Sequence, residues 1–492
     1  MESVPAAPAV DAPAGELGRP RLSLVDVVAQ SIGFIGPVFS VAFLLPSVAG
    51  LGFTGKGAGV GSPLALIVAT IGMCGVAWII SCYARRIHAA GALYDYVTDG
   101  FGQRVGFLAG WVYYGGMTLL CVAIFPAFGG FMALTLLGNH NIDIKWWILA
   151  LASVVAVFGM TILGVQISTR TQLTLALVSV SVIFSWIIYV IVKGGVHGNS
   201  GTPFDPSAIS FNDLFYGLLY ACLVFTGFET AANLAEETAE PRRSIPRAVL
   251  WSVVGVGAFY VIVTYGLELA FGLDMGAFLD PKNFPPLYTA AANPAFGGST
   301  FGEVVQWIVL VDIFAVALGV ANACSRGYFA LARDGRLPRQ LGAVHPRLRT
   351  PWVAAGLLGV VSAVLVILTE VTDGIVSGAP SDPGVWFRFF QFGATFGALG
   401  LIIVYFLIAV SGFLGQPGEN RIGLAIAAIV GAAATLAAIW GTVYKAPAVY
   451  SLDKVWWLTA AWAGLGVLVL LFLHSRGDFD RQTSAQERHG SG

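Results

Sequence analysis

Apolar runs of about 20 residues recur along almost the whole sequence, and each is long enough to cross a bilayer as a helix. This repetition constrains the fold more than any other feature. The runs lie near residues 25–50, 63–83, 102–132, 146–166, 172–192, 213–236, 247–271, 304–331, 352–370, 387–414, 421–443 and 454–474. Because 57% of the residues are hydrophobic and 11% are charged, the pattern excludes a soluble domain. It predicts an all-α integral membrane protein with about twelve transmembrane helices.

The positions of the basic residues predict how these helices are oriented. With the N-terminus inside the cell, 19 of the 26 lysines and arginines fall in cytoplasmic segments and seven in external ones. This asymmetry follows the positive-inside rule. We therefore expect a multi-pass plasma-membrane protein with both termini in the cytoplasm. The start of the chain lacks the features of a cleaved signal, and we expect disordered tails at residues 1–22 and 476–492.

Several kinds of chemistry have no signature in this sequence. The five cysteines all lie inside apolar runs, with neither metal-ligand spacing nor a disulfide framework. No phosphate-binding loop, nucleophile constellation or basic nucleic-acid tract is present. The sequence thus predicts no enzymatic activity, metal, cofactor or nucleic-acid partner, and it leaves the oligomeric state open.

The sixth apolar run is interrupted at residues 225–229, which read Phe-Thr-Gly-Phe-Glu. Gly227 weakens a helix by about 1 kcal/mol relative to alanine, and Glu229 costs roughly 3 kcal/mol at the middle of a membrane. Two interpretations remain open. Either the helix is kinked and a neighbouring hydroxyl satisfies Glu229, or the helix is discontinuous and its unwound backbone offers carbonyls and amides to a polar solute.

The first apolar run carries a comparable interruption at residues 33–37, which read Gly-Phe-Ile-Gly-Pro. Pro37 cannot donate to the helical hydrogen-bond ladder, and the two glycines ease unwinding. A simple proline kink is the alternative to a true break. Two breaks at matching places in two halves of a chain point to a transporter site.

The spacing of these features predicts an internal repeat. Gly33 and Gly227 are 194 residues apart, and the third and eighth spans start near Phe101 and Phe301, which are 200 residues apart. We therefore expect five-helix repeats at residues 23–200 and 201–415, with two further helices at residues 416–475.

Three more side chains stand out within the apolar runs. Tyr113 lies near one end of the third run, where an aromatic residue either anchors the helix at the interface or lines a solute path. Asp312 lies inside the eighth run and is either a structural carboxylate bound to a hydroxyl or part of a pathway. Glu268 lies near the outer end of the seventh run, where we expect it to be exposed.

Three motifs occur in an order that resembles the amino acid–polyamine–organocation (APC) superfamily of permeases. Residues 225–248 combine Phe-Thr-Gly-Phe-Glu, Leu-Ala-Glu-Glu-Thr and Glu-Pro-Arg-Arg-Ser-Ile-Pro-Arg-Ala, which resembles the sixth-helix signature of these permeases. Residues 89–111 resemble the segment around their third helix, and residues 325–338 resemble their eighth-helix exit. Together with the twelve spans, the resemblance covers nearly the whole chain. It implies the five-plus-five inverted-repeat fold of the bacterial leucine transporter, with solute held between helices one, three, six, eight and ten.

The sequence also departs from that family pattern at two places. Many members carry Gly-Ser-Gly-Ile or a similar sequence in the first-helix break, whereas this chain has the bulkier Phe34 and also Pro37. The fifth span lacks the lysine whose amine replaces a sodium ion in some members.

These observations predict a secondary active transporter of amino acids that works by alternating access and is coupled to protons. A solute carboxylate would meet amides at the first break, and its ammonium would meet carbonyls at the second. Glu229 is the first candidate for proton coupling and Asp312 the second. The predicted solute-binding residues are Ile32, Gly33, Phe34, Ile35, Gly36, Pro37, Tyr113, Phe225, Thr226, Gly227 and Phe228.

Two other functions remain open from the sequence. The two acidic residues would also suit a polyamine or an ethanolamine-like amine as the transported solute. A protein of another class, a transporter-shaped sensor or a subunit that does not itself transport, would carry the same spans.

Overall fold

The computed structural model describes residues 22–50, 57–372, 376–378, 382–414, 420–444 and 448–475. These residues are almost entirely helical, and they contain no β-strand beyond one isolated bridge between Leu22 and Thr238. Twelve helical segments among them are long and apolar enough to cross a membrane. The prediction of an all-α membrane protein with about twelve spans is therefore confirmed.

Two of the spans are interrupted near the middle, and each of the other ten is formed mainly by one long helix. The first span consists of α1 (Leu24–Ile35) and α2 (Pro37–Phe43), and the sixth of α9 (Phe211–Leu223) and η5 (Phe228–Glu237). The single helices are α4 (Ser62–Ala84), α6 (Gln103–His140), α7 (Trp146–Leu163), α8 (Val165–Lys193), α10 (Pro241–Ala270), α13 (Ser299–Arg333), α14 (Trp352–Val371), α15 (Val385–Leu414), α16 (Arg421–Val443) and α17 (Leu452–Ser475).

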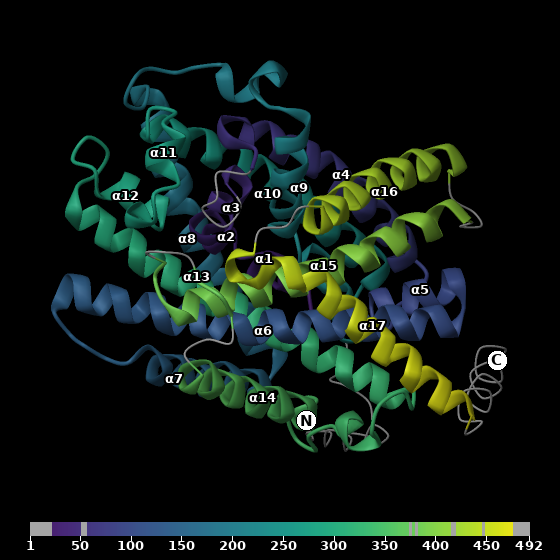
Figure 1. Ribbon diagram of the computed structural model, residues 1–492. Coiled ribbons are helices and arrows are strands. Elements are labelled where there is room, and N and C mark those ends of the chain that lie inside the picture. The colour runs from purple at the N-terminus through teal and green to yellow at the C-terminus, as the bar shows by residue number, and fades with distance from the viewer. Residues whose placement is uncertain are drawn as a thin grey trace, which may run out of the picture.

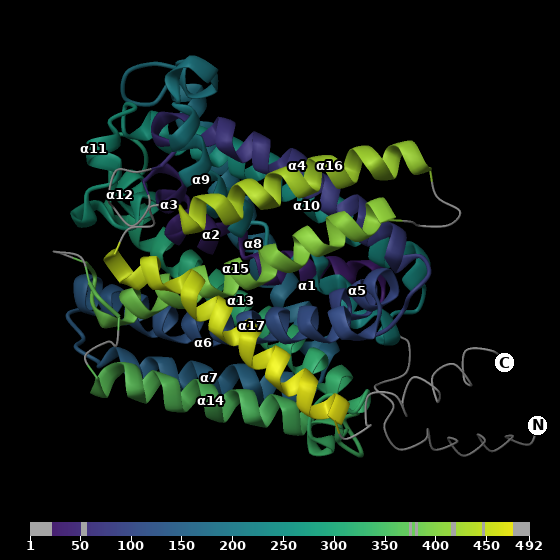
Figure 2. The same ribbon diagram turned by 45° about the vertical axis from the view of Figure 1, so that its right-hand side comes forward.

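Short elements cover the two ends of this bundle. The short helix α5 (Leu93–Phe101) and the 3-10 turn η7 (Arg339–Gly342) lie between spans at one end, which we call the α5 end. The helices α3 (Leu45–Ala49), α11 (Met275–Phe278) and α12 (Pro286–Ala292) lie at the opposite end, which we call the α12 end. Both views of the ribbon separate the two groups in this way (Figures 1 and 2). Further 3-10 turns are η2 (Gly59–Gly61), η3 (Thr202–Phe204), η4 (Pro206–Ala208), η6 (Pro281–Asn283) and η8 (Val449–Ser451).

The two composite spans lie at the centre of the bundle. The helix α1 packs against α8, α10, α13 and η5, and nearly all of its side chains after Val28 are buried. In contrast, α14, α16 and α17 present rows of apolar side chains on the outside of the bundle. An apolar exterior is the expected surface of a protein in lipid. The interrupted helices are therefore enclosed by continuous ones.

Candidate functional site

The first span is broken where the sequence predicts it. The helix α1 ends at Ile35, Gly36 adopts a left-handed backbone with φ +56°, and α2 begins at Pro37. Pro37 has no N–H to donate to the preceding turn, and proline is favoured as the first residue of a new helix. Glycine enters the left-handed region without steric cost. The interruption is thus a change of helix and not only a kink.

The sixth span is broken at the matching place. The helix α9 ends at Leu223, Gly227 has φ +111°, and the chain resumes as the 3-10 helix η5. The Thr226 N–H donates to the Leu223 carbonyl at 2.9 Å, which closes a tight turn in place of an α-helical turn. The predicted discontinuity of this helix is therefore confirmed.

The two breaks face each other directly. The Ser31 hydroxyl of α1 donates to the Phe228 carbonyl at 2.8 Å, and the Ala231 N–H donates to the Ser31 Oγ at 3.3 Å. A side chain on Gly227 would overlap the ring of Phe34. The position of the Phe34 ring thus requires glycine at residue 227 as much as the backbone angle does.

Glu229 is fully buried behind the second break, and each of its oxygens has a partner. The Tyr113 hydroxyl donates to Oε1 at 2.7 Å, and the Tyr405 hydroxyl donates to Oε2 at 2.6 Å. The Gly227 N–H also donates to Oε2, at 3.0 Å. Neighbouring hydroxyls therefore satisfy Glu229, as the kinked-helix interpretation expected, although the helix is broken. Tyr113 lies in the core of the bundle, and its hydroxyl is directed at this carboxylate.

Asp312 is fully buried beside the first break and holds the start of α2. Its Oδ2 accepts the N–H groups of Val38 at 3.0 Å and of Phe39 at 2.8 Å. The next amide, that of Ser40, donates to the Gly36 carbonyl within the helix. The partners of Asp312 are therefore backbone amides and not the hydroxyl that the structural alternative expected. In this conformation the carboxylate occupies the amides predicted to receive a solute carboxylate.

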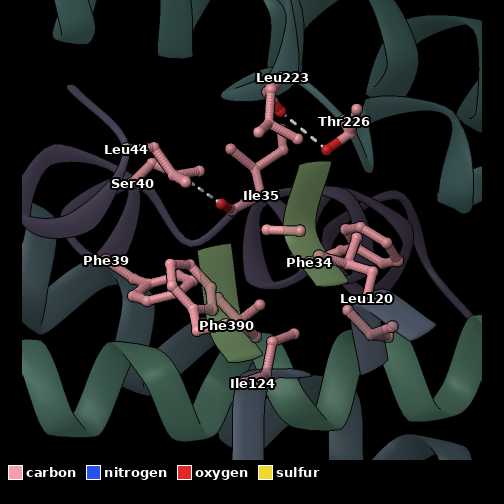
Figure 3. A pocket seen from close by; sticks show the side chains of 13 residues that line it. Phe34, Ile35, Phe39, Ser40, Leu44, Leu120, Ile124, Leu223, Thr226 and Phe390 are labelled. Atoms are coloured by element: carbon pink, nitrogen blue, oxygen red, sulfur yellow. Dashed lines mark hydrogen bonds between the residues drawn. The ribbon is translucent and has the colours of Figure 1, made fainter. Parts of the chain in front are cut away.

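A small cavity of about 20 Å³ lies between the two breaks (Figure 3). Eleven of its thirteen lining residues are apolar, and the other two are Ser40 and Thr226. Both hydroxyls donate to main-chain carbonyls, those of Ile35 and Leu223 respectively. The lining consists of Phe34, Ile35, Phe39, Ser40, Leu44, Leu120, Ile124, Leu223, Thr226, Val316, Val320, Phe390 and Ala394. A cavity of this size holds about one water molecule, so it is too small for a solute in this conformation.

The predicted solute-binding residues are only partly brought together around this cavity. Three of them line it, namely Phe34, Ile35 and Thr226. The remaining eight belong to the break segments or contact Glu229 without lining the cavity: Ile32, Gly33, Gly36, Pro37, Tyr113, Phe225, Gly227 and Phe228. Sequence reasoning missed the lining residues from α2, α6, α13 and α15, because apolar residues on these helices resemble ordinary core residues.

An ionic contact closes the α5 end of the bundle. The Arg326 guanidinium of α13 binds the Glu237 carboxylate at the end of η5 through two hydrogen bonds of 2.6 and 3.3 Å, and both side chains are almost fully buried. The backbone of Leu22 pairs with Glu237 and Ala239, which ties the start of the first span to the same place. A more exposed pair, Arg333 with Glu236, lies nearby.

Aromatic rings close the α12 end. Phe43 of α2 packs edge-to-face against Phe131 and Phe390 and against Phe284, which precedes α12. Trp386 extends the cluster on α15. The cavity is therefore shut by charged side chains on one side and by aromatic rings on the other.

The expectation that Glu268 is exposed is wrong, because this side chain is completely buried. The chain turns back over the end of α10, where the Leu273 N–H donates to the Glu268 carbonyl at 2.9 Å. The sequence of the apolar run does not show that the chain turns back over its end, so the burial of Glu268 could not be predicted from it.

Comparison with known proteins identifies one family over nearly the whole chain. The amino acid permease family model matches residues 23–471. The chain is 28% identical to the low-affinity putrescine importer PlaP of Escherichia coli over 70% of its length and 74% of that protein. It is 30% identical to an uncharacterized transporter of Mycobacterium tuberculosis, covering 73% of this chain and 76% of that one. It is 25% identical to the branched-chain amino acid permease BcaP of Bacillus subtilis, covering 65% and 70%.

These matches agree with the three sequence motifs, the twelve spans and the two facing breaks. The protein is a multi-pass membrane transporter whose relatives carry amino acids or amines. The chain belongs to the amino acid permease family, within the APC superfamily.

Proposed function

We propose that the protein is a secondary active transporter that moves a small amino acid or amine across the plasma membrane by alternating access. One observation carries this proposal: two interrupted helices face each other around a central cavity that is closed at both ends. Interrupted helices expose backbone groups that can bind a polar solute inside the membrane. Relatives described as a putrescine importer and a branched-chain amino acid permease support the same class of solute.

Alternating access requires that the two closures open one at a time. The closures have different chemistry, an ion pair at the α5 end and packed rings at the α12 end. A cavity of about 20 Å³ cannot admit a solute until one of them opens. The described residues hold twelve candidate spans, and an even number of spans supports both chain ends lying on one side of the membrane. Together with the basic residues of the sequence, this supports placing the α5 end and both termini in the cytoplasm.

Coupling to protons is assigned first to Glu229. A protonated carboxyl needs an acceptor for its new O–H, and a tyrosine hydroxyl can either donate or accept. Tyr113 and Tyr405 both contact Glu229, so either hydroxyl can turn and accept that hydrogen. Protonation of Glu229 would therefore affect the conformation of the second break, because the Glu229 carboxylate also accepts the Gly227 N–H. Asp312 remains the second candidate for proton coupling.

Proteoliposomes containing purified protein test this function. Solute counterflow measures transport without any gradient, and uptake driven by an inward proton gradient measures coupling. We expect Glu229→Gln to retain counterflow and to lose gradient-driven accumulation. The matched control is Glu268→Gln, which removes another fully buried carboxyl in α10 and should retain both.

Each outcome of this experiment separates two explanations. Accumulation by the Glu229→Gln variant in response to a proton gradient would assign Glu229 a structural role. Asp312→Asn would then be tested in the same way, followed by sodium. Absence of counterflow in the wild-type protein with any amino acid or amine would contradict transport and favour a sensor or a subunit.

The repeat boundaries are part of the same proposal. The breaks occupy the first and sixth spans, which supports repeats at residues 23–200 and 201–415 with two added spans at residues 416–475.

A further inference from the structure

We propose that the transported solute is a primary amine with an apolar body and no carboxylate, and that Asp312 supplies the negative charge the solute lacks. This inference rests on the proposed transport function and names its substrate class. It follows from which hydrogen-bonding groups around the cavity are occupied and which are not.

The donors around the cavity are already used. A solute carboxylate needs N–H or O–H groups or a cation. The first-turn amides of α2 donate to Asp312, and the hydroxyls of Ser40 and Thr226 donate to main-chain carbonyls. None of the thirteen lining residues is arginine, lysine or histidine. A carboxylate entering this cavity would therefore lose its hydration without finding a donor, which is costly.

The acceptors, in contrast, are in surplus at the first break. Pro37 has no N–H, so the Gly33 carbonyl lacks its usual helical donor four residues ahead. The Val38 N–H points to Asp312, so the Phe34 carbonyl also lacks its usual donor. Among the described residues, the Oδ1 atom of Asp312 is buried without a hydrogen-bond partner. An ammonium group supplies three N–H donors and one positive charge, which are the groups this region lacks.

Asp312 does not itself line the cavity but lies directly behind its wall. It binds the N–H of Phe39, whose side chain lines the cavity, and it precedes the lining residue Val316 by one turn of α13. A buried carboxylate without a cationic partner is unfavourable in a low-dielectric region. A cationic solute beside it would offset that cost, whereas an anionic group would add to it.

The remaining lining predicts the rest of the solute. Phe34, Phe39 and Phe390 provide aromatic faces, and Leu120 and Ile124 provide aliphatic contacts (Figure 3). None of the thirteen lining residues is acidic. The other carboxylate beside the breaks, Glu229, already accepts hydrogen bonds on both oxygens, so a second ammonium at the far end of the solute would find no free carboxylate. An aliphatic or aromatic monoamine fits this lining better than a diamine does.

Counterflow in proteoliposomes with matched solutes tests the inference. The pairs are isoamylamine with leucine and phenethylamine with phenylalanine, because each amine is the amino acid without its carboxylate, and putrescine serves as the diamine. We expect at least one monoamine to exchange tenfold or more faster than its amino acid partner and faster than putrescine. Leucine or phenylalanine exchanging as fast as its amine would overturn the inference and leave the transport function standing. So would putrescine exchanging faster than both monoamines. No exchange of any of the five solutes would overturn the inference, and counterflow with further amino acids and amines would then decide the transport function.

A charge-removing variant tests the role of Asp312. Asp312→Asn keeps an oxygen that can accept from the α2 amides and loses the negative charge. We expect at least a tenfold loss of isoamylamine exchange, with Glu268→Gln as the control for removing a buried carboxyl. A variant that elutes as a folded monodisperse protein and exchanges isoamylamine at the wild-type rate would refute the assignment. If Asp312→Asn does not fold, the competition of leucine against isoamylamine in wild-type protein decides the question.

Discussion

The buried ion pair at the α5 end makes a quantitative prediction about closure. Arg326 and Glu237 are almost fully buried, with N–O distances of 2.6 and 3.3 Å. Removing one partner of such a pair leaves an uncompensated buried charge and costs about 3–5 kcal/mol. Since about 1.4 kcal/mol corresponds to a factor of ten, Arg326→Met should lower the ratio of closed to open protein at this end by roughly 10²- to 4 × 10³-fold.

A native cysteine reports this closure. Cys324 lies two residues before Arg326 in α13 and is completely buried. We expect an impermeant maleimide to label it slowly in the wild-type protein and at least tenfold faster in Arg326→Met. The matched control is Arg333→Gln, which breaks the half-exposed pair with Glu236 in the same region. Such a pair contributes about 0–1 kcal/mol, so labelling should stay near the wild-type rate.

The comparison of these two variants can refute the reasoning. Equal labelling rates in Arg326→Met and Arg333→Gln would show that the buried pair does not hold the α5 end closed. A double variant that replaces Arg326 and Glu237 with apolar residues should recover part of the stability, because it leaves no unpaired charge.

Three further predictions concern other parts of the site. Tyr405→Phe removes a hydrogen bond to the buried Glu229 carboxylate and should cost about 1.5–3 kcal/mol of stability, visible as a lower thermal unfolding midpoint in detergent. Gly36→Ala should destabilise the protein far more than Gly59→Ala, because both have positive φ but only Gly36 faces a side chain within contact distance; equal midpoints would contradict this. Burial and neighbouring acids raise the pKa of Asp95, on α5, to about 8. Between pH about 4 and 8 the folded state therefore binds a proton that the unfolded state releases, so the stability should fall as the pH rises through this range. Asp95→Asn should remove this pH dependence of the thermal unfolding midpoint.

The breaks could be predicted from the sequence because their causes are local. Pro37 removes a donor from its own helix, and Gly227 permits a backbone angle that other residues avoid. Each of these effects depends only on the residue and its immediate neighbours. Charge in an apolar run is equally visible, which is why Glu229 and Asp312 could be named in advance.

The partners of those residues could not be predicted, because they come from distant parts of the chain. Asp312 binds Val38 and Phe39, more than 270 residues away in sequence, and no local pattern encodes that pairing. The residues that line the cavity could not be predicted from the sequence either. Leu120 and Phe390 differ from other core residues only in what the fold places beside them.

The second half of the sixth span also has a mechanical consequence. It is a ten-residue 3-10 helix, whereas such helices rarely exceed three or four residues. A 3-10 helix rises about 2.0 Å per residue and an α-helix about 1.5 Å. Rewinding η5 into an α-helix would therefore shorten it by about 5 Å. Since Glu237 is its last residue and binds Arg326, such a contraction would pull directly on that ion pair. The segment between the central cavity and the α5 end can thus change its length by about 5 Å through a change of helix type.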